Sequence, residues 1–136
     1  GHPVGCAVAL KVLEIYQRDD IFARAAASGT YLQNRLRELE QHPLVGEVRG
    51  KGLLAAIELV ANKDTGQAFE GGAIGAYAAL RAQHHGLVVR PVAGSSLALC
   101  PPLIITQAQI DELVEKLARA LDDTLAHAEH EGLLVA

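Results

Sequence analysis

The stretch Gly86-Leu-Val-Val-Arg-Pro-Val-Ala-Gly-Ser-Ser-Leu-Ala-Leu-Cys-Pro-Pro-Leu-Ile-Ile-Thr106 carries the clearest fold signal in this chain. It predicts strands over 87–89 and 97–99 joined by a turn at 94–96, because apolar, partly β-branched runs flank a Gly-Ser-Ser turn. The double proline at 101–102 ends the second strand, since proline lacks the amide hydrogen that a β-ladder requires. The stretch therefore predicts a β-hairpin followed by a stop.

Arg90 is the unusual residue of this hairpin. It stands at the end of a run that otherwise looks buried, between Val89 and Pro91, whose ring fixes the backbone angle φ. A guanidinium can hold a carboxylate through two parallel hydrogen bonds, which a lysine cannot match. Local chemistry alone leaves two interpretations open. Arg90 is either an exposed strand terminator, which is the more frequent case, or a fixed anion receptor.

Two helices precede the hairpin in the predicted order of elements. Residues 4–17 form a helix that is apolar on nearly every face, which indicates contact with protein on several sides. A domain this small cannot provide so much contact, so we expect this helix to pack against protein outside the chain. A second helix, capped by Asp19 or Asp20 and ending near Gln41, has a single apolar stripe and is predicted to lie on the surface.

Two further strands follow the second helix. Residues 45–48 and 53–60 are rich in apolar side chains, and the segment 49–52, Arg-Gly-Lys-Gly, predicts a hairpin turn or bulge between them. The second of these strands is almost continuously apolar, which indicates a central and covered position. A polar loop over 61–72 is predicted next.

Two more helices complete the predicted elements. Residues 73–85 form a short helix that Gly86 terminates. The last helix begins at Thr106, where Gln109 completes a capping box, and we expect the tail over 127–136 to fray. Strands joined by tight turns favour antiparallel pairing. The predicted fold class is therefore α+β, with a three- or four-stranded, mainly antiparallel sheet and the helices packed on one face.

Composition excludes several classes of function. The chain has 136 residues, half of them hydrophobic, and a net charge of −4. Its size predicts one domain, and its acidic balance without any basic run argues against nucleic-acid binding. Because the sequence has no apolar run long enough to span a bilayer and no signal peptide, we expect a cytoplasmic protein that does not bind membranes. Cys6 and Cys100 lack any paired spacing, which favours free thiols.

Catalysis by side chains of this chain finds little support, and no catalytic residue or metal site is predicted. His84 and His85 are neighbours on a helix and point to different faces. His127 and His130 are one turn apart and could chelate weakly, but the sequence offers no third ligand, so a solvated tail is the preferred interpretation. The acidic pair 122–123 is interpreted as an exposed helix position, either a solvated face or a cap.

Four blocks of the sequence together resemble one family. They are residues 1–7 (Gly-His-Pro-Val-Gly-Cys-Ala), residues 48–60, residues 86–91 and residues 100–106 (Cys-Pro-Pro-Leu-Ile-Ile-Thr). In this order and spacing they resemble the class-III aminotransferases. These are pyridoxal-phosphate enzymes of fold type I that include the ω-amine and ω-amino acid transaminases. The likeness runs through the whole chain and places it at the C-terminal end of the family's usual sequence.

This resemblance implies a small C-terminal domain without most of the enzyme. Residues 1–17 would be a linking helix that bridges to an absent large domain, and residues 18–136 would be the small domain. In the family, the large domain supplies the Schiff-base lysine and most contacts to pyridoxal 5′-phosphate. None of the lysines here matches that motif: Lys11, Lys51, Lys63 and Lys116. We therefore assign no cofactor-binding residue to this chain and expect it to be inactive by itself.

The resemblance assigns one substrate-binding residue, Arg90. In ω-transaminases and diaminopelargonate-type enzymes, the arginine at this strand-end position receives the substrate carboxylate. Ornithine-like members instead place an arginine three residues before the double proline, and here that position is Ala98. The difference favours the ω-type and leaves Arg90 as the obvious carboxylate receptor of the segment.

The implied function is transfer of an amino group from an amine or ω-amino acid to an α-keto acid such as pyruvate. The implied enzyme is a homodimer that carries pyridoxal 5′-phosphate, whose chemistry the protein orients. Two alternatives stay open. One is a non-catalytic structural or interaction domain that kept the scaffold, and the other is a regulatory binding module whose complete gene lacks the Schiff-base lysine.

Overall fold

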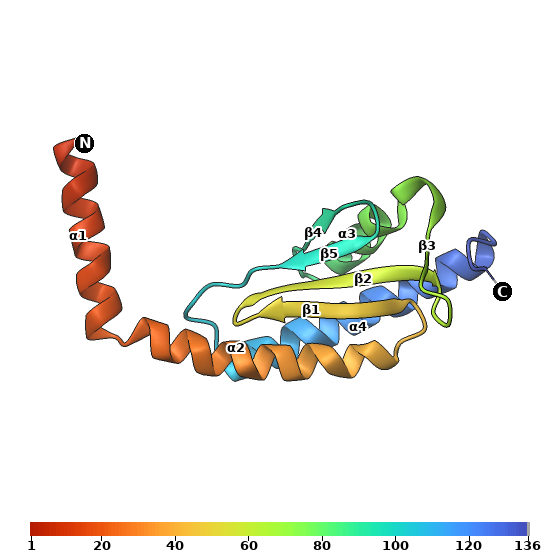
Figure 1. The fold of residues 1–136 in the computed structure, drawn as a ribbon, viewed down its shortest axis with the longest axis horizontal. Coiled ribbons are helices and arrows are strands. Elements are labelled where there is room, and N and C mark those ends of the chain that lie inside the picture. Colours follow the sequence, from red (N-terminus) through yellow and green to blue (C-terminus); the bar gives the residue numbers. More distant parts are fainter. Residues whose placement is uncertain (136) are drawn as a thin grey trace.

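The computed structural model describes residues 1–135 and shows an antiparallel sheet with helices packed on one side (Figure 1). The helices are α1 (Pro3–Arg18), α2 (Ile21–Arg37), η1 (Glu38–Gln41), η2 (Glu70–Gly72), α3 (Ile74–His84) and α4 (Gln107–His130). The strands are β1 (Val45–Lys51), β2 (Leu54–Asn62), β3 (Gln67–Ala68), β4 (Arg90–Val92) and β5 (Ser96–Leu99). Both cysteines are exposed free thiols. Among residues 1–135, no helix combines the length and the hydropathy needed to cross a membrane.

The sheet has five strands within the described residues. Four of them follow in the order β1-β2-β5-β4, and each neighbouring pair is antiparallel. The prediction of an α+β fold with a mainly antiparallel sheet is confirmed. The sheet has one strand more than predicted, because β3 adds a two-residue pairing to β2 from the segment predicted as a loop.

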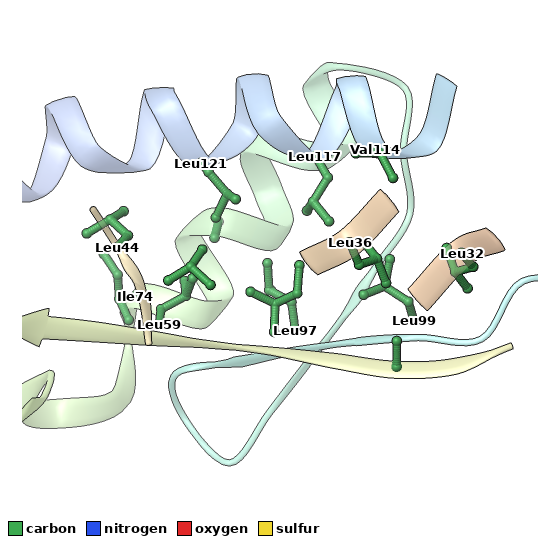
Figure 2. Packing of buried hydrophobic residues seen from close by; sticks show 14 of the residues in the cluster. Leu32, Leu36, Leu44, Leu59, Ile74, Leu97, Leu99, Val114, Leu117 and Leu121 are labelled. Carbon is green, nitrogen blue, oxygen red and sulfur yellow. The ribbon is translucent and has the colours of Figure 1, made fainter. Parts of the chain in front are cut away.

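The hydrophobic core lies between the sheet and helices α2, α3 and α4. Leu59 of β2 and Leu97 and Leu99 of β5 point toward Leu117 and Leu121 of α4 (Figure 2). All five side chains are almost completely buried. Because successive side chains of a strand alternate between the two faces of a sheet, the residues between these leucines must face the opposite side. That opposite side carries the arginine singled out by the sequence.

The first strand of the Arg90 hairpin lies three residues later than predicted. The prediction placed it at 87–89, whereas β4 begins at Arg90 itself. Residues 87–89 form no ladder because the chain is still leaving α3, where the amide of Leu87 donates to the carbonyl oxygen of Ala82 at 2.9 Å. Arg90 therefore begins a paired strand instead of ending one.

The turn of this hairpin lies one residue earlier than predicted, at 93–95 in place of 94–96. Ala93 and Gly94 both have positive φ, 47° and 78°. Glycine adopts such angles freely, whereas an alanine there is strained by roughly 1 kcal/mol or more. Gly94 indicated the turn correctly. Ala93 also belongs to the turn, but the sequence could not indicate this because alanine disfavours a positive φ.

The hairpin between β1 and β2 also turns later than predicted. β1 continues through Lys51, and residues 52–53 form a two-residue loop in place of the predicted turn over 49–52. Gly52 supplies the positive φ, 59°, that this tight connection requires. The irregular register lies at the other end of the pair, between Val45 and Glu47.

The C-terminal tail is attached to the molecule. Ala128, in the last part of α4, is fully buried. The amide of Val135 donates to the carbonyl oxygen of Ala61, and the Asn62 side-chain amide donates to the carbonyl oxygen of Val135, both at 3.1 Å. The predicted fraying is therefore wrong for 127–135, because both ends of this segment have partners in the body of the fold. Residue 136 lies outside the described residues.

Helix α1 extends away from the sheet and the other helices (Figure 1). None of its residues is buried. Five of its large apolar side chains are between 39% and 64% exposed: Val4, Val8, Leu10, Val12 and Leu13. At the junction with α2, the rings of Tyr16 and Phe22 meet edge to face with centroids 5.3 Å apart. An uncovered apolar surface of this kind is typical of a contact with other protein.

We expect the 136-residue chain to self-associate through α1 when it is purified alone. Burying one leucine contributes about 1.5–3 kcal/mol, so Leu10→Glu should weaken this association roughly tenfold or more. Sedimentation equilibrium over a concentration series measures the effect. Leu80→Glu, which changes an exposed leucine of α3 instead, is the matched control. A wild-type chain that stays monomeric at every concentration would contradict the expectation.

Candidate functional site

Arg90 lies on the face of the sheet that the helices leave open. It pairs across the sheet with Ala98, Ala98 pairs with Ala56, and Ala56 pairs with Arg49. Cross-strand partners point to the same face, so these four side chains form one row, called here the arginine–alanine row. The adjacent row contains the fully buried Leu97 and faces the helices. The arginine–alanine row therefore faces away from the core.

The two arginines of the row differ in their electrostatic surroundings. Arg49 donates to Glu58 at 2.5 Å and to Glu47 at 2.9 Å, and these carboxylates raise the pKa of Arg49. Within residues 1–135, Arg90 takes part in no ion pair and in no side-chain hydrogen bond, and it is exposed. Its guanidinium therefore has its donors available for a carboxylate that the rest of the chain does not supply.

The open face beside Arg90 is shallow. Ala98 and Ala56 separate the two arginines with methyl groups only. Leu54, on the same face of β2, is 61% exposed. The prediction that this central strand is covered thus holds for its helix-facing side and for Val60 near its end, whereas Leu54 on the open face is exposed. A ligand or another protein surface can approach Arg90 across the alanines.

A separate hollow of about 620 Å³ lies between residues 86–88, residues 99–106 and the first half of α4. Its walls are mainly apolar, and Lys116 pairs with Glu112 at 2.6 Å along its side. Arg90 does not line this hollow. The candidate carboxylate site and the hollow are therefore different features of the surface.

His127 and His130 contact neighbouring side chains of the chain. In the part of the chain that the structure describes, no group of three or more His, Cys, Asp or Glu side chains could hold a metal. His127 stacks on Tyr77 with ring centroids 3.9 Å apart and planes inclined by 14°. His130 contacts Glu131 at 3.0 Å. The solvated-tail interpretation is thus wrong for His127, because the ring of Tyr77 covers it.

Sequence reasoning missed an ion cluster that joins α3 to α4. Asp123 accepts hydrogen bonds from Nε and Nη2 of Arg81, at 3.0 and 2.7 Å, and lies 2.8 Å from Nε2 of His85. The hydrogen bonds from Arg81 and then from His85 hold the pKa of Asp123 below its ordinary value of 3.8. The pair 122–123 was interpreted as an exposed solvated face or cap, which is wrong for Asp123. No local spacing rule could find partners that only tertiary packing brings together.

Asp123→Asn should lower the stability of the chain at neutral pH by about 0.2–1 kcal/mol, the usual contribution of a partly exposed ion pair. A carboxyl whose folded-state pKa is depressed stabilises the fold above its unfolded pKa, and this contribution is lost as pH falls through the folded value. Melting temperatures of wild type and variant should therefore differ at pH 7 and converge in acid below the ordinary value of 3.8. Glu129→Gln, at an exposed carboxylate of α4 that takes part in no ion pair within residues 1–135, is the control. A difference that persists unchanged into acid would contradict this.

The lysines do not resemble a Schiff-base site. Lys11, Lys51 and Lys63 are exposed, and Lys116 is held by Glu112. A lysine that forms a Schiff base needs a lowered pKa, which desolvation or a neighbouring cation provides. The assignment of the cofactor lysine to protein outside this chain stays a prediction.

Residues 1–121 match the family described as aminotransferase class-III. This match covers most of the chain, and it includes Arg90, the row in which it stands and the double proline after β5. The chain belongs to the class-III aminotransferase family.

Individual relatives agree with this assignment. The chain is 42% identical over 127 residues to the putrescine–pyruvate aminotransferase of Pseudomonas aeruginosa, covering 93% of this chain and 28% of the relative. It is 42% identical over 126 residues to gamma aminobutyrate transaminase 3 of Solanum lycopersicum, covering 91% of this chain and 24% of the relative.

Solved structures show the same fold. The solved structure of a transaminase with L-Ala superposes with a TM-score of 0.90 at 48% identity, over 95% of this chain and 30% of that one. The ω-transaminase of Pseudomonas jessenii in complex with PMP gives a TM-score of 0.85 at 44% identity, over 90% of this chain and 27% of that one. The chain thus spans about a quarter to three tenths of the length of the relatives it matches.

Proposed function

We propose that this chain is the small C-terminal domain of an ω-type aminotransferase that transfers an amino group from an amine or ω-amino acid to an α-keto acid. Family membership and the names of the relatives, which include a putrescine–pyruvate aminotransferase and a gamma aminobutyrate transaminase, support this reading. Putrescine is a diamine and gamma aminobutyrate an ω-amino acid, so both belong to the proposed class of donors.

The observation that carries the proposal is the unpaired guanidinium of Arg90 on the open sheet face. Arg90 would hold the carboxylate of the keto acid through a bidentate, charge-assisted pair of hydrogen bonds. Its position supports this role, because the small side chains of Ala98 and Ala56 leave the approach free and Arg49 is already neutralised by Glu47 and Glu58. Arg90 is thus the available cation of the arginine–alanine row.

The cofactor of the proposed enzyme is pyridoxal 5′-phosphate. When bound, it stabilises the negative charge that develops on the substrate carbon during amino transfer. Because none of the four lysines matches the family's Schiff-base motif, we place the cofactor lysine outside this chain. The contribution of this chain would be to bind and orient the substrate carboxylate through Arg90, so the chain by itself should be inactive.

The exposed helix α1 supports a division at its end. Residues 1–17 would link to a large domain that covers the apolar side chains of α1, and residues 18–136 would form the small domain. We further propose a homodimeric, cytoplasmic enzyme, as the family resemblance implies. The competing proposal, a non-catalytic domain that kept the scaffold, is favoured by no particular side chain of this structure.

The decisive experiment uses the complete protein that contains this sequence. We expect it to bind pyridoxal 5′-phosphate, with absorbance near the edge of the visible range, and to transfer an amino group from putrescine or gamma aminobutyrate to pyruvate. The 136-residue chain alone should do neither. A complete protein that has no Schiff-base lysine and binds no cofactor would overturn the proposal in favour of the non-catalytic alternative.

A further inference from the structure

We propose that helix α3 positions Arg90 by holding the segment that carries it at both ends, and that Gly75 is the residue that permits this arrangement. The inference rests on the proposed role of Arg90 as carboxylate receptor. Gly75 is a positioning residue in this account and touches no substrate. The argument starts from how little else holds the strand of Arg90.

β4 is a weakly held strand. It is three residues long and lies at the edge of the sheet, where it pairs with β5 alone. Pro91, its central residue, has no amide hydrogen to contribute to the ladder. The four-residue β5 and a short ladder would leave the direction of the Arg90 side chain loosely defined. Something beyond the sheet has to fix it.

The C-terminal end of α3 holds the beginning of the segment. The amide of Gly86 donates to the carbonyl oxygen of Gln83, and the amide of Leu87 donates to that of Ala82, both at 2.9 Å. Gly86 has φ of 78°, the left-handed angle that such a helix end requires. The chain therefore leaves α3 in a defined direction three residues before Arg90.

The N-terminal end of α3 holds the other end of the segment. No side chain caps this helix, but the amide of Gly75 in its first turn donates to the carbonyl oxygen of Gly94 at 3.1 Å. The tip of the β4–β5 hairpin thus satisfies one of the free amides that every helix start leaves. The same tip is also fixed to β2, because the amide of Leu59 donates to the carbonyl oxygen of Ser95 at 2.8 Å.

The two attachments fit the lengths of the elements. The eleven residues of α3 span roughly 16 Å at 1.5 Å per residue. An extended chain between residues 87 and 93 spans roughly 20 Å, so the segment can run along the helix from one end to the other. α3 is itself fixed to α4 through Arg81 and Asp123. Arg90 consequently lies in the middle of a segment that is hydrogen-bonded to the C-terminal end of α3 on one side and to its N-terminal end on the other.

The close approach at Gly75 leaves no room for a side chain. A Cβ at this position would lie 2.5 Å from the carbonyl oxygen of Gly94, which no real contact allows. Gly72 approaches the same tip less tightly, with its Cβ position 3.2 Å from the Cα of Gly94. Gly75→Ala must therefore push the hairpin tip away from α3, break the hydrogen bond and redirect β4.

Gly75→Ala in the complete, cofactor-loaded enzyme tests the inference. A misplaced binding group can cost up to a hundredfold, so we expect KM for pyruvate to rise roughly tenfold. Turnover with an acceptor that has no carboxylate, such as propanal, should stay within about twofold. Only a substrate whose carboxylate binds Arg90 can lose the roughly 1.4 kcal/mol of binding free energy that a tenfold change represents. Arg90→Ala is measured in parallel.

Gly29→Ala is the matched control for a purely structural effect. Its Cβ would lie 2.5 Å from the Cα of Gly52, so it creates a backbone clash of the same severity between α2 and the β1–β2 hairpin. That clash is remote from β4 in the sheet order. It should lower the melting temperature, as Gly75→Ala does, without raising KM for pyruvate selectively.

The outcomes separate the inference from the proposed function. If Arg90→Ala leaves KM for pyruvate unchanged, Arg90 does not bind the carboxylate, and both the proposed function of Arg90 and this inference are wrong. If Arg90→Ala raises this KM while folded Gly75→Ala does not, or if Gly29→Ala raises it equally, the positioning role of Gly75 is wrong. Should Gly75→Ala fail to fold, Gly72→Ala replaces it. Its Cβ would lie 3.2 Å from the Cα of Gly94 and its φ of 66° adds local strain, so an unchanged KM in the folded Gly72→Ala enzyme would equally overturn the inference.

Discussion

Replacing Arg90 with alanine in the complete enzyme is expected to raise KM for pyruvate roughly 10- to 100-fold. The bidentate contact as a whole is expected to contribute about 1.5–3 kcal/mol, the usual range for hydrogen bonding to a charged group, which corresponds to this loss of affinity. Arg90 has no other partner among the described residues, so its removal leaves no buried charge of the protein unpaired. The loss should therefore appear in binding of the carboxylate and hardly at all in stability.

Steady-state kinetics with two kinds of substrate measure this effect. KM for a simple amine donor, which has no carboxylate, should change by less than about threefold. Such a donor does not contact Arg90, so it does not lose the binding free energy that corresponds to about 1.4 kcal/mol for each tenfold change in affinity. Arg90→Lys keeps the charge and loses the bidentate fork, so it should fall between wild type and alanine. Equal increases of KM for keto acid and amine would rule out a carboxylate receptor.

Leu117→Ala is expected to destabilise the domain by about 2–5 kcal/mol, the usual cost of removing a fully buried leucine. Leu117 is fully buried and projects from α4 into the cluster between α4 and the sheet, toward Leu97 and Leu36 (Figure 2). Close packing on all sides leaves the neighbours little freedom to fill the cavity. Because a small domain is stable by only about 5–15 kcal/mol, this is a large fraction of the total.

Urea unfolding of the 136-residue chain measures the loss. The midpoint should fall while the slope stays constant, since the surface exposed on unfolding hardly changes. Leu80→Ala removes the same atoms from a half-exposed position on α3 and should cost within about 0.5 kcal/mol. A cost for Leu117→Ala as small as that of Leu80→Ala would contradict the core described here.

The order of elements and the fold class could be predicted because local signals agreed with each other. The capping box at Thr106 and Gln109 and the helix end at Gly86 occur where predicted. Alternating and continuous apolar runs identified β2 and β5. Boundaries were less accurate, as at Arg90, since pairing depends on where the chain leaves α3. A propensity calculation has no access to that hydrogen bond between Leu87 and Ala82.

Features that depend on tertiary contact could not be predicted. The partners of Asp123 lie about forty residues earlier on another helix, and the contact of Gly75 with Gly94 joins two elements through backbone atoms alone. The tail over 127–135 looked like a fraying terminus because its attachment to Asn62 is not encoded in any local pattern. The sequence singled out Arg90 as a candidate residue, and its placement opposite Ala98 emerged only from the strand register.

The acceptor half of the reaction tests the central claim most directly. The complete enzyme, carrying the amino group on its cofactor, is mixed with excess pyruvate or with propanal, and the rate of a single turnover is followed by absorbance. The account predicts that Arg90→Ala lowers the apparent affinity for pyruvate roughly 10- to 100-fold and leaves that for propanal nearly unchanged. An Arg90→Ala enzyme that keeps the wild-type preference for pyruvate over propanal would contradict it.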